Sequence, residues 1–228
     1  VADLIQDGAT LQTGIGSLPD AIMSSLKSRR DLGLHTGMAT ESSMILYESG
    51  ALTNARKQVD TGVSVAGMAL GSHALYRFLH ENSAFSFRST LETHDVERIR
   101  TIEKFVAINS ALEVDITGQI NAEAVGNRYL GAVGGAGSFL RGAALSHGGL
   151  PIVALPSTSS KDGHVDTRIV SRLNGPVSTA RVDAGLIVTE YGVADLRNKT
   201  LRQRRDAMIA IAAPQFRDTL DTSTSINF

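Results

Sequence analysis

Short apolar runs alternate with stretches of helical periodicity along most of this chain. The apolar runs are rich in Val, Ile and Leu and predict strands at residues 10–13, 32–35, 63–66, 105–109, 152–155 and 186–189. Helical patterns lie at residues 21–27, 42–48, 73–79, 139–146 and 201–211. Continuous apolar strands with helices between them are typical of a parallel sheet covered on both faces. The sequence therefore predicts an α/β fold with an open, largely parallel sheet and helices on both faces.

Length and composition agree with a globular protein. The 228 residues are 42% hydrophobic and 20% charged, which is ordinary for this class. We expect one domain over residues 1–220, because no linker divides them, and a polar tail at 221–228. The net charge is −1 and the basic residues are scattered, so neither nucleic acid nor a membrane surface is an expected partner.

Three absences from the sequence narrow the expected chemistry. There is no cysteine, which excludes disulfide bonds, thiolate catalysis and cysteine-ligated metal and fits a reducing compartment such as the cytoplasm. None of the six histidines has the spacing of a metal motif such as HExxH, so no metal is expected. No apolar run approaches the roughly 20 residues that cross a bilayer.

Turns after the apolar runs are the candidate sites, because a parallel α/β sheet binds ligands beyond the carboxyl ends of its strands. In TGIGSLPD, at 13–20, Gly14 and Gly16 allow a ligand to approach the backbone, and free amides at the helix start favour negative charge. The third glycine of a dinucleotide fingerprint is missing. On spacing alone, a tight strand-to-helix turn is the simpler explanation.

A second turn, GAVGGAGSF at 131–139, has four glycines in nine residues ahead of a helix. Glycine loses the most conformational freedom on folding, so close approach of a ligand to the backbone would justify such a loop. Tight packing of the following helix against the sheet would justify it as well. Both interpretations remain open from the residues alone.

Polar residues near the strand ends are also open to two interpretations. Glu190 follows the last apolar run, where it can enter a crevice, although such carboxylates are usually caps or ion-pair partners, as we expect of Asp195 and Arg197. His35 ends the second run, before a turn that reads HTG, and is better explained as a structural histidine than as a base. Glu41 most simply serves the first turn of the helix that follows it.

Six segments together resemble the acetyl-CoA hydrolase/transferase family, which includes 4-hydroxybutyrate, butyryl, acetate and succinyl CoA-transferases. They are LQTGIGSLPDAI, LGLHTGM, FVAINSALEVDITGQINAE, GGAGSFLRGAA, LPSTSS and VTEYGVADLRNKTLRQR, in the family's order and spacing. The resemblance is to the C-terminal half of those enzymes. It implies a CoA-transferase-like α/β domain that packs against a missing N-terminal half or partner subunit, and a homo-oligomer.

The resemblance also implies a reaction and a set of site residues. In the family a glutamate attacks an acyl-CoA thioester, a glutamyl-CoA thioester forms, and an acceptor carboxylate regenerates acyl-CoA. Coenzyme A is thus expected as a thioester substrate, with a small carboxylate as second substrate. By match to the family's motifs, amides of Ile15 and Gly16 would stabilise oxyanions, and Glu190 would lie beside the nucleophile. The residues expected against the pantetheine and thioester are Gly134, Gly135, Ala136 and Gly137.

The nucleophile itself is missing from the matching turn. Where relatives read HTE or HSE, this chain places Gly37, and the spacing to ESG at 48–50 leaves no gap that would bring Glu41 into register. His94 falls where relatives commonly have an asparagine. Three interpretations remain open: water attacks the thioester with help from Glu190 or His94, Glu41 substitutes as nucleophile, or the domain binds CoA or a partner without turnover.

Overall fold

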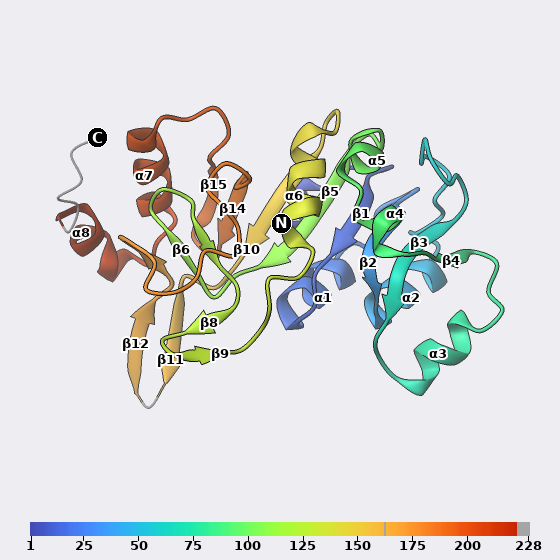
Figure 1. Ribbon diagram of the computed structural model, residues 1–228, viewed down its shortest axis with the longest axis horizontal. Helices are drawn as coiled ribbons and strands as arrows, with labels where there is room; N and C mark the ends of the chain where they lie inside the picture. Colours follow the sequence, from blue (N-terminus) through green and yellow to red (C-terminus); the bar gives the residue numbers. More distant parts are fainter. Residues whose placement is uncertain (162, 223–228) are drawn as a thin grey trace. The chain divides into compact units, whose positions relative to one another are not determined.

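The computed structural model describes residues 1–161 and 163–222 (Figure 1). The chain divides into two compact units, and segments of each come from two separate parts of the sequence. The first unit consists of residues 1–109 and 138–151, and the second of residues 110–137 and those from 152 onward.

The first unit is built on five strands in the order β5-β1-β2-β3-β4, and every neighbouring pair is parallel. The strands are β1 (Thr10–Thr13), β2 (Gly33–Ala39), β3 (Ser64–Ala69), β4 (Phe85–Phe87) and β5 (Phe105–Ser110). The helical elements are η1 (Ala2–Leu4), α1 (Ser17–Ser24), α2 (Glu41–Glu48), α3 (His73–Leu79), α4 (Thr90–Thr93), α5 (Val96–Arg100) and α6 (Ala136–Leu145).

Apolar side chains cover both faces of these strands. Leu11 of β1 and Phe105 of β5 are completely buried, as the continuous apolar runs predict. Helices α1 and α2 pack against each other, and α4 packs on β2 and β3. Phe139 of α6 stacks on Phe105, with 6.4 Å between the ring centroids. Burial of large side chains such as these stabilises the unit by about 1.5–3 kcal/mol each.

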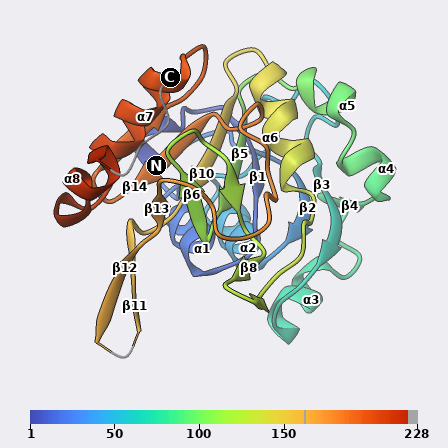
Figure 2. The ribbon, with the colours of Figure 1, turned by 60° about the vertical axis from the view of Figure 1, so that its left-hand side comes forward.

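The second unit has three longer strands and several small sheets. Strand β10 (Leu150–Ala154) pairs in parallel with β14 (Leu186–Thr189), and β15 (Gly192–Asp195) returns antiparallel to β14. The small strands are β6 (Glu113–Asp115), β7 (Ile120–Asn121), β8 (Ala124–Val125), β9 (Arg128–Tyr129), β11 (Thr158–Lys161), β12 (His164–Thr167) and β13 (Ile169–Val170). Figure 2 shows β11 and β12 extending together as a two-stranded ribbon.

Two helices end the described part of the second unit. Helix α7 (Leu201–Ala210) begins with a capping box in which Thr200 and Gln203 each satisfy the other's backbone amide. Helix α8 (Pro214–Thr222) follows after a short break. The described helices include none long and apolar enough to cross a bilayer.

The predicted α/β fold with a mostly parallel sheet is confirmed, and each predicted strand and helix is present, most of them with shifted ends. The prediction of a turn at HTG is wrong. Strand β2 continues through Gly37 to Ala39, because its parallel pairing with β3 persists as far as Ala69. Helix α8 covers residues 221–222 of the predicted tail, and residues 223–228 lie outside the described part. The single domain over 1–220 stays a prediction.

Candidate functional site

Three neighbouring strands of the first unit have a glycine at the same level. The register of β2 and β3 places Gly37 level with Gly67, and the register at the start of β1 and β2, when it is extended past the end of β1, brings Gly14 to the same level. A Cβ on Gly67 would come within 2.9 Å of the carbonyl oxygen of Gly37. These three residues, called the glycine row below, leave bare backbone toward the carboxyl ends of the strands, where α/β sheets bind ligands.

The imidazole of His94 lies against Gly37. His94 directly follows α4, and its Cε1 and Nε2 atoms are 3.2 Å from the position that a Cβ would take on Gly37. The ring of Phe139 approaches the same position to 3.5 Å and lies 4.6 Å from the imidazole, centroid to centroid. The φ of Gly37 is outside the left-handed region, so these two rings, and not the backbone, restrict a side chain there.

Hydrogen bonds of Thr93 orient the imidazole of His94. The Thr93 hydroxyl oxygen is 2.8 Å from Nδ1 of His94 and 3.3 Å from the carbonyl oxygen of Ser89, which can only accept. Both bonds form together when the hydroxyl donates to Ser89 and Nδ1–H donates to the hydroxyl oxygen. In that tautomer Nε2 has a free lone pair at Gly37. Burial lowers the pKa of His94 below its usual value, so the ring is mainly neutral at pH 7.

The turn at 13–20 has the predicted strand-to-helix form. Gly16 is the N-cap of α1 with φ of 125°, a value that favours glycine, and Ile15 is 59% exposed. The amide of Gly14 donates to the carbonyl of Ile108. Within the described residues, the amides of Ile15 and Gly16 donate to no protein acceptor. Both are therefore available to a ligand that accepts hydrogen bonds.

Glu41 is bound to the start of another helix. It is the first residue of α2, as expected, but its carboxylate accepts a hydrogen bond from the amide of Ser72, the N-cap of α3. This bond from the Ser72 backbone holds the pKa of Glu41 below its usual value. The carboxylate is thus stabilised as an anion at the α3 terminus, and this contact opposes a role as substitute nucleophile.

Glu190, in the second unit, follows β14 and is held by Ser157. The Ser157 amide donates to one carboxylate oxygen at 2.9 Å, and its hydroxyl donates to the other at 2.6 Å. Ser157 is completely buried, whereas Glu190 is exposed. Partial burial acts to raise the pKa of Glu190, but the hydrogen bonds from Ser157 outweigh it and lower the pKa overall. Glu190 is therefore an oriented anion at neutral pH.

Tight packing does not explain Gly134 and Gly137 of the glycine-rich loop. A Cβ on Gly137 would meet nothing within 4 Å, and one on Gly134 only the carbonyl of Ala132 at 3.8 Å. Gly134 does adopt a left-handed φ of 58°, which glycine favours. Packing explains Gly142 inside α6 instead, where a Cβ would overlap the side chain of Ile99. Gly134 and Gly137 are thus free of packing constraints, and Ala136 is the first residue of α6.

Other predicted residues have structural roles. His35 is completely buried and its Nε2 contacts the carbonyl oxygen of Thr93 at 3.0 Å, which confirms a structural histidine. Asp195 and Arg197 form the predicted local ion pair, at 2.8 Å. Among the described residues, no group of three or more His, Asp or Glu side chains is placed to hold a metal ion.

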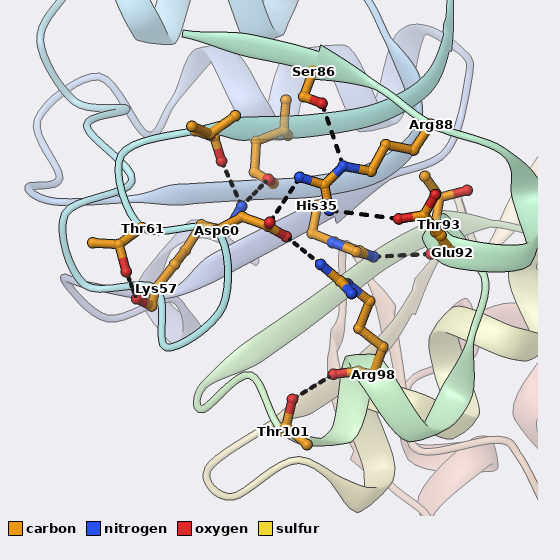
Figure 3. Close-up of polar contacts among 12 residues, drawn as sticks. His35, Lys57, Asp60, Thr61, Ser86, Arg88, Glu92, Thr93, Arg98 and Thr101 are labelled. Atoms are coloured by element: carbon orange, nitrogen blue, oxygen red, sulfur yellow. Dashed lines mark hydrogen bonds and ion pairs between the residues drawn. The ribbon is translucent and has the colours of Figure 1, made fainter.

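Sequence reasoning missed the residues that support the site. Gln12 and Asn109 exchange hydrogen bonds at 3.3 and 3.0 Å beside the glycine row. Figure 3 shows Asp60 between Arg88 and Arg98, which precede and follow His94 in the chain. These residues are visible in the sequence only as polar side chains in strands and loops. Nothing in the sequence indicates which of these side chains contact each other in the fold.

Comparison of the sequence with known proteins gives one family of matches along nearly the whole chain. Residues 71–224 match the model of the acetyl-CoA hydrolase/transferase C-terminal domain. The chain is 41% identical over 221 residues to 4-hydroxybutyrate coenzyme A transferase of Clostridium kluyveri, covering 96% of this chain and 51% of that protein. It is 31% identical over 219 residues to acetyl-CoA hydrolase of Yarrowia lipolytica, covering 92% of this chain and 39% of that protein.

Solved protein structures also match this chain over nearly its whole length. The crystal structure of RipA from Yersinia pestis matches with a TM-score of 0.92 and 39% identity over 97% of this chain and 50% of that chain. The 4-hydroxybutyrate CoA-transferase of Porphyromonas gingivalis matches with a TM-score of 0.86 and 38% identity over 100% of this chain and 54% of that chain. The chain thus spans about half the length of these relatives.

Proposed function

Because this chain belongs to the acetyl-CoA hydrolase/transferase family, we propose that it forms the C-terminal half, or one subunit, of an enzyme that acts on acyl-CoA thioesters. The acyl group is that of a short carboxylic acid, and coenzyme A enters as part of the substrate. The missing N-terminal half or partner subunit completes the enzyme, which assembles as a homo-oligomer. Both CoA-transferases and acetyl-CoA hydrolases among the relatives support thioester chemistry.

The position of Nε2 of His94 beside Gly37 is the observation that favours one of the two family reactions, CoA transfer or thioester hydrolysis. Gly37 stands in place of the family's glutamate and has no side chain that could form an anhydride. Nε2 lies 3.2 Å from the point where that side chain would begin. A neutral imidazole with a free lone pair is a good general base near pH 7. This favours hydrolysis by water over transfer through a covalent glutamyl intermediate.

The hydrolytic step needs one water molecule and one base. Water attacks the thioester carbonyl carbon, and Nε2 of His94 accepts its proton as the carbon–oxygen bond forms. Collapse of the tetrahedral intermediate breaks the carbon–sulfur bond, and the imidazolium returns the proton to the CoA thiolate. The products are a free carboxylic acid and CoA thiol. Amides of Ile15 and Gly16 donate to the developing oxyanion, and each such donor is typically worth about 100- to 1,000-fold in turnover.

The second unit contributes an anion and an open loop in this proposal. The resemblance to the family assigns Glu190 to the acyl-CoA substrate, and both donors of Ser157 keep its charge and orientation. Its lowered pKa supports an electrostatic or orienting role over that of a proton donor. The loop residues Gly134, Gly135, Ala136 and Gly137 lie along the pantetheine, and the absence of packing at Gly134 and Gly137 supports this.

A thiol-release assay on the full protein, with its other half or partner subunit present, tests the proposal. Short acyl-CoA thioesters are supplied with a thiol-trapping reagent and an isotope-labelled acceptor carboxylate. We expect thiol release without label in the CoA ester. His94→Asn, which installs the residue common in relatives, should lower thiol release by about 100-fold or more. His147→Asn, at an exposed position, is the control.

Other outcomes identify the alternatives. Label in the CoA ester together with a borohydride-trapped glutamyl thioester at Glu41 would establish transfer with a substitute nucleophile. Binding of a CoA analogue without turnover of any thioester would establish a binding domain that is catalytically silent. Equal losses in His94→Asn and His147→Asn would remove His94 from the reaction.

A further inference from the structure

One carboxylate holds both ends of the segment that carries His94. Asp60 lies in the loop between α2 and β3, and its Oδ1 contacts a guanidinium nitrogen of Arg88 at 2.7 Å. Its Oδ2 contacts a guanidinium nitrogen of Arg98 at 2.8 Å. Figure 3 shows both ion pairs. Arg88 precedes α4 and Arg98 lies in α5, so the two arginines lie on either side of His94 in the sequence. The Asp60 side chain is only 13% exposed, which strengthens both pairs relative to surface ones.

The middle of the same segment is attached to β2. His35 reaches the carbonyl oxygen of Thr93 through Nε2 at 3.0 Å, and because a carbonyl only accepts, Nε2 must carry the proton. His35 lies two residues before Gly37 on the same strand and on the same face. Residues 88–98 are therefore fixed at three points, and the central one joins the backbone next to His94 to the strand that contains Gly37.

The loop that carries Asp60 is itself rigidly attached. Nζ of Lys57 donates to the carbonyls of Leu34 in β2, at 3.0 Å, and Val63, at 2.6 Å. The hydroxyl of Thr61 donates to the carbonyl of Lys57 at 2.8 Å and closes the loop (Figure 3). The loop that carries Asp60 is thus attached to β2, and Asp60 in turn attaches both arginines to this loop.

The backbone of Asp60 has a conformation that is uncommon for a residue with a side chain. Its φ is 57°, in the left-handed region that costs a non-glycine residue free energy. Glycine or asparagine would adopt this conformation more readily. The two ion pairs of Asp60 are contacts that can offset this cost.

We propose that Asp60 is a positioning residue that fixes the imidazole of His94 against Gly37 by holding residues 88–98 at both ends. The proposal rests on the base role given to His94 above. Without the two ion pairs the segment loses its outer attachments, and the imidazole leaves the position at which water is activated. Misplacement of a catalytic group by about 1 Å typically costs about 100-fold in rate. Substrate affinity depends on other residues and changes little.

Asp60→Gly and Asp60→Asn test this in the full protein. Both residues tolerate a left-handed φ, so neither adds backbone strain. Glycine removes both ion pairs, whereas asparagine keeps one oxygen acceptor. We expect turnover in the thiol-release assay to fall by about 10- to 100-fold in Asp60→Gly and less in Asp60→Asn, with KM for acyl-CoA changed by less than about threefold. The pKa of His94, measured by NMR of the imidazole, should rise toward its ordinary value as the ring becomes solvated.

A matched control exists at Asp31. It has a left-handed φ of 56° and an ion pair with Arg56 at 3.4 Å, but its side chain is 38% exposed and that of Arg56 is 69% exposed. Asp31→Gly and Asp31→Asn should leave both the turnover and the NMR signals of His94 unchanged. Arg98→Lys is the milder variant if Asp60→Gly does not fold. It keeps the charge but loses the planar guanidinium, and should give a smaller shift of the same sign.

The outcome that overturns the proposal is an unchanged imidazole pKa of His94 in folded Asp60→Gly protein. A loss of turnover that the Asp31 variants share would overturn it as well. The NMR measurement does not depend on turnover, so it decides the role of Asp60 even if the wild-type protein releases no thiol and the proposed function fails.

Discussion

Nε2 of His94 lies 3.2 Å from the place that the first side-chain atom of residue 37 would occupy, and the glycine there leaves that place empty. The two residues are therefore complementary in shape. A larger group at one position requires a smaller group, or a displaced one, at the other. Gly37 and His94, which we propose stand in place of the family's glutamate and asparagine, belong to one local arrangement of the site.

This complementarity predicts that Gly37→Glu is tolerated better together with His94→Asn than alone. A Cβ at residue 37 presses on the imidazole, and overpacking of this kind costs about 1–3 kcal/mol. Asparagine removes the ring atoms that are in the way. We expect the single variant to have a lower midpoint of urea unfolding than the double variant, and labelled carboxylate to enter the CoA ester only in the double variant. Equal midpoints would show that the imidazole does not occupy this space.

Ser157→Ala should raise the pKa of Glu190. The Ser157 hydroxyl bond helps to lower this pKa below its usual value, so its loss shifts protonation of the carboxylate to higher pH. The acidic limb of the pH profile for thiol release should move upward in parallel with the titration of the Glu190 carboxyl carbon in NMR. Ser160→Ala, at an exposed position in the same segment, is the control and should shift neither.

We expect the buried, neutral His35 to make the folded protein less stable at acidic pH. Burial, reinforced by the charges of Lys57 and Arg98, lowers its pKa from 6.5 to about 4. As the pH falls below 6.5 the unfolded chain binds a proton that the folded chain does not, so the free energy of unfolding decreases, by about 3 kcal/mol when pH 4 is reached. Urea unfolding between pH 7 and pH 4 measures this. His35→Gln keeps a donor for Thr93 and should lose this part of the pH dependence, and an unaltered slope would contradict it.

Two glycines of α6 should respond oppositely to alanine. In Gly142→Ala the new methyl group overlaps Ile99, so we expect destabilisation by about 1–3 kcal/mol despite alanine's higher helix propensity. In Gly137→Ala the methyl group meets nothing within 4 Å, so the same propensity should stabilise by up to about 1 kcal/mol. Urea midpoints compare the two. A rise in KM for acyl-CoA confined to Gly137→Ala would support the loop as a binding surface.

The sequence predicts the fold well because its signal is local. The run at residues 186–189 coincides with β14, and the pattern at 73–79 coincides with α3, since periodicity of apolar residues determines both. Strand β2 is longer than predicted because HTGMA is not an apolar run. It remains a strand through pairing with β3, and that pairing is a non-local property.

The site was less accessible to sequence reasoning for the same reason. The place of Glu190 after an apolar run makes it a candidate, but its partner Ser157 is 33 residues away and no local pattern links the two. Asp60 meets Arg88 and Arg98 across 28 and 38 residues through a left-handed backbone that no residue pattern indicates. Short motifs indicate candidate residues, whereas the contacts that hold those residues depend on the tertiary fold.

The bare backbone at Gly37 has a consequence for how such a domain can change its reaction. An enzyme that attacks with its own glutamate fixes the first acyl acceptor covalently, within its sequence. In the reaction that we propose, the acceptor has to diffuse in, so its identity depends on which small molecules the surroundings supply and on how freely they enter. Altered access to the glycine row would be enough to exchange one acceptor for another, with every strand of the sheet left as it is.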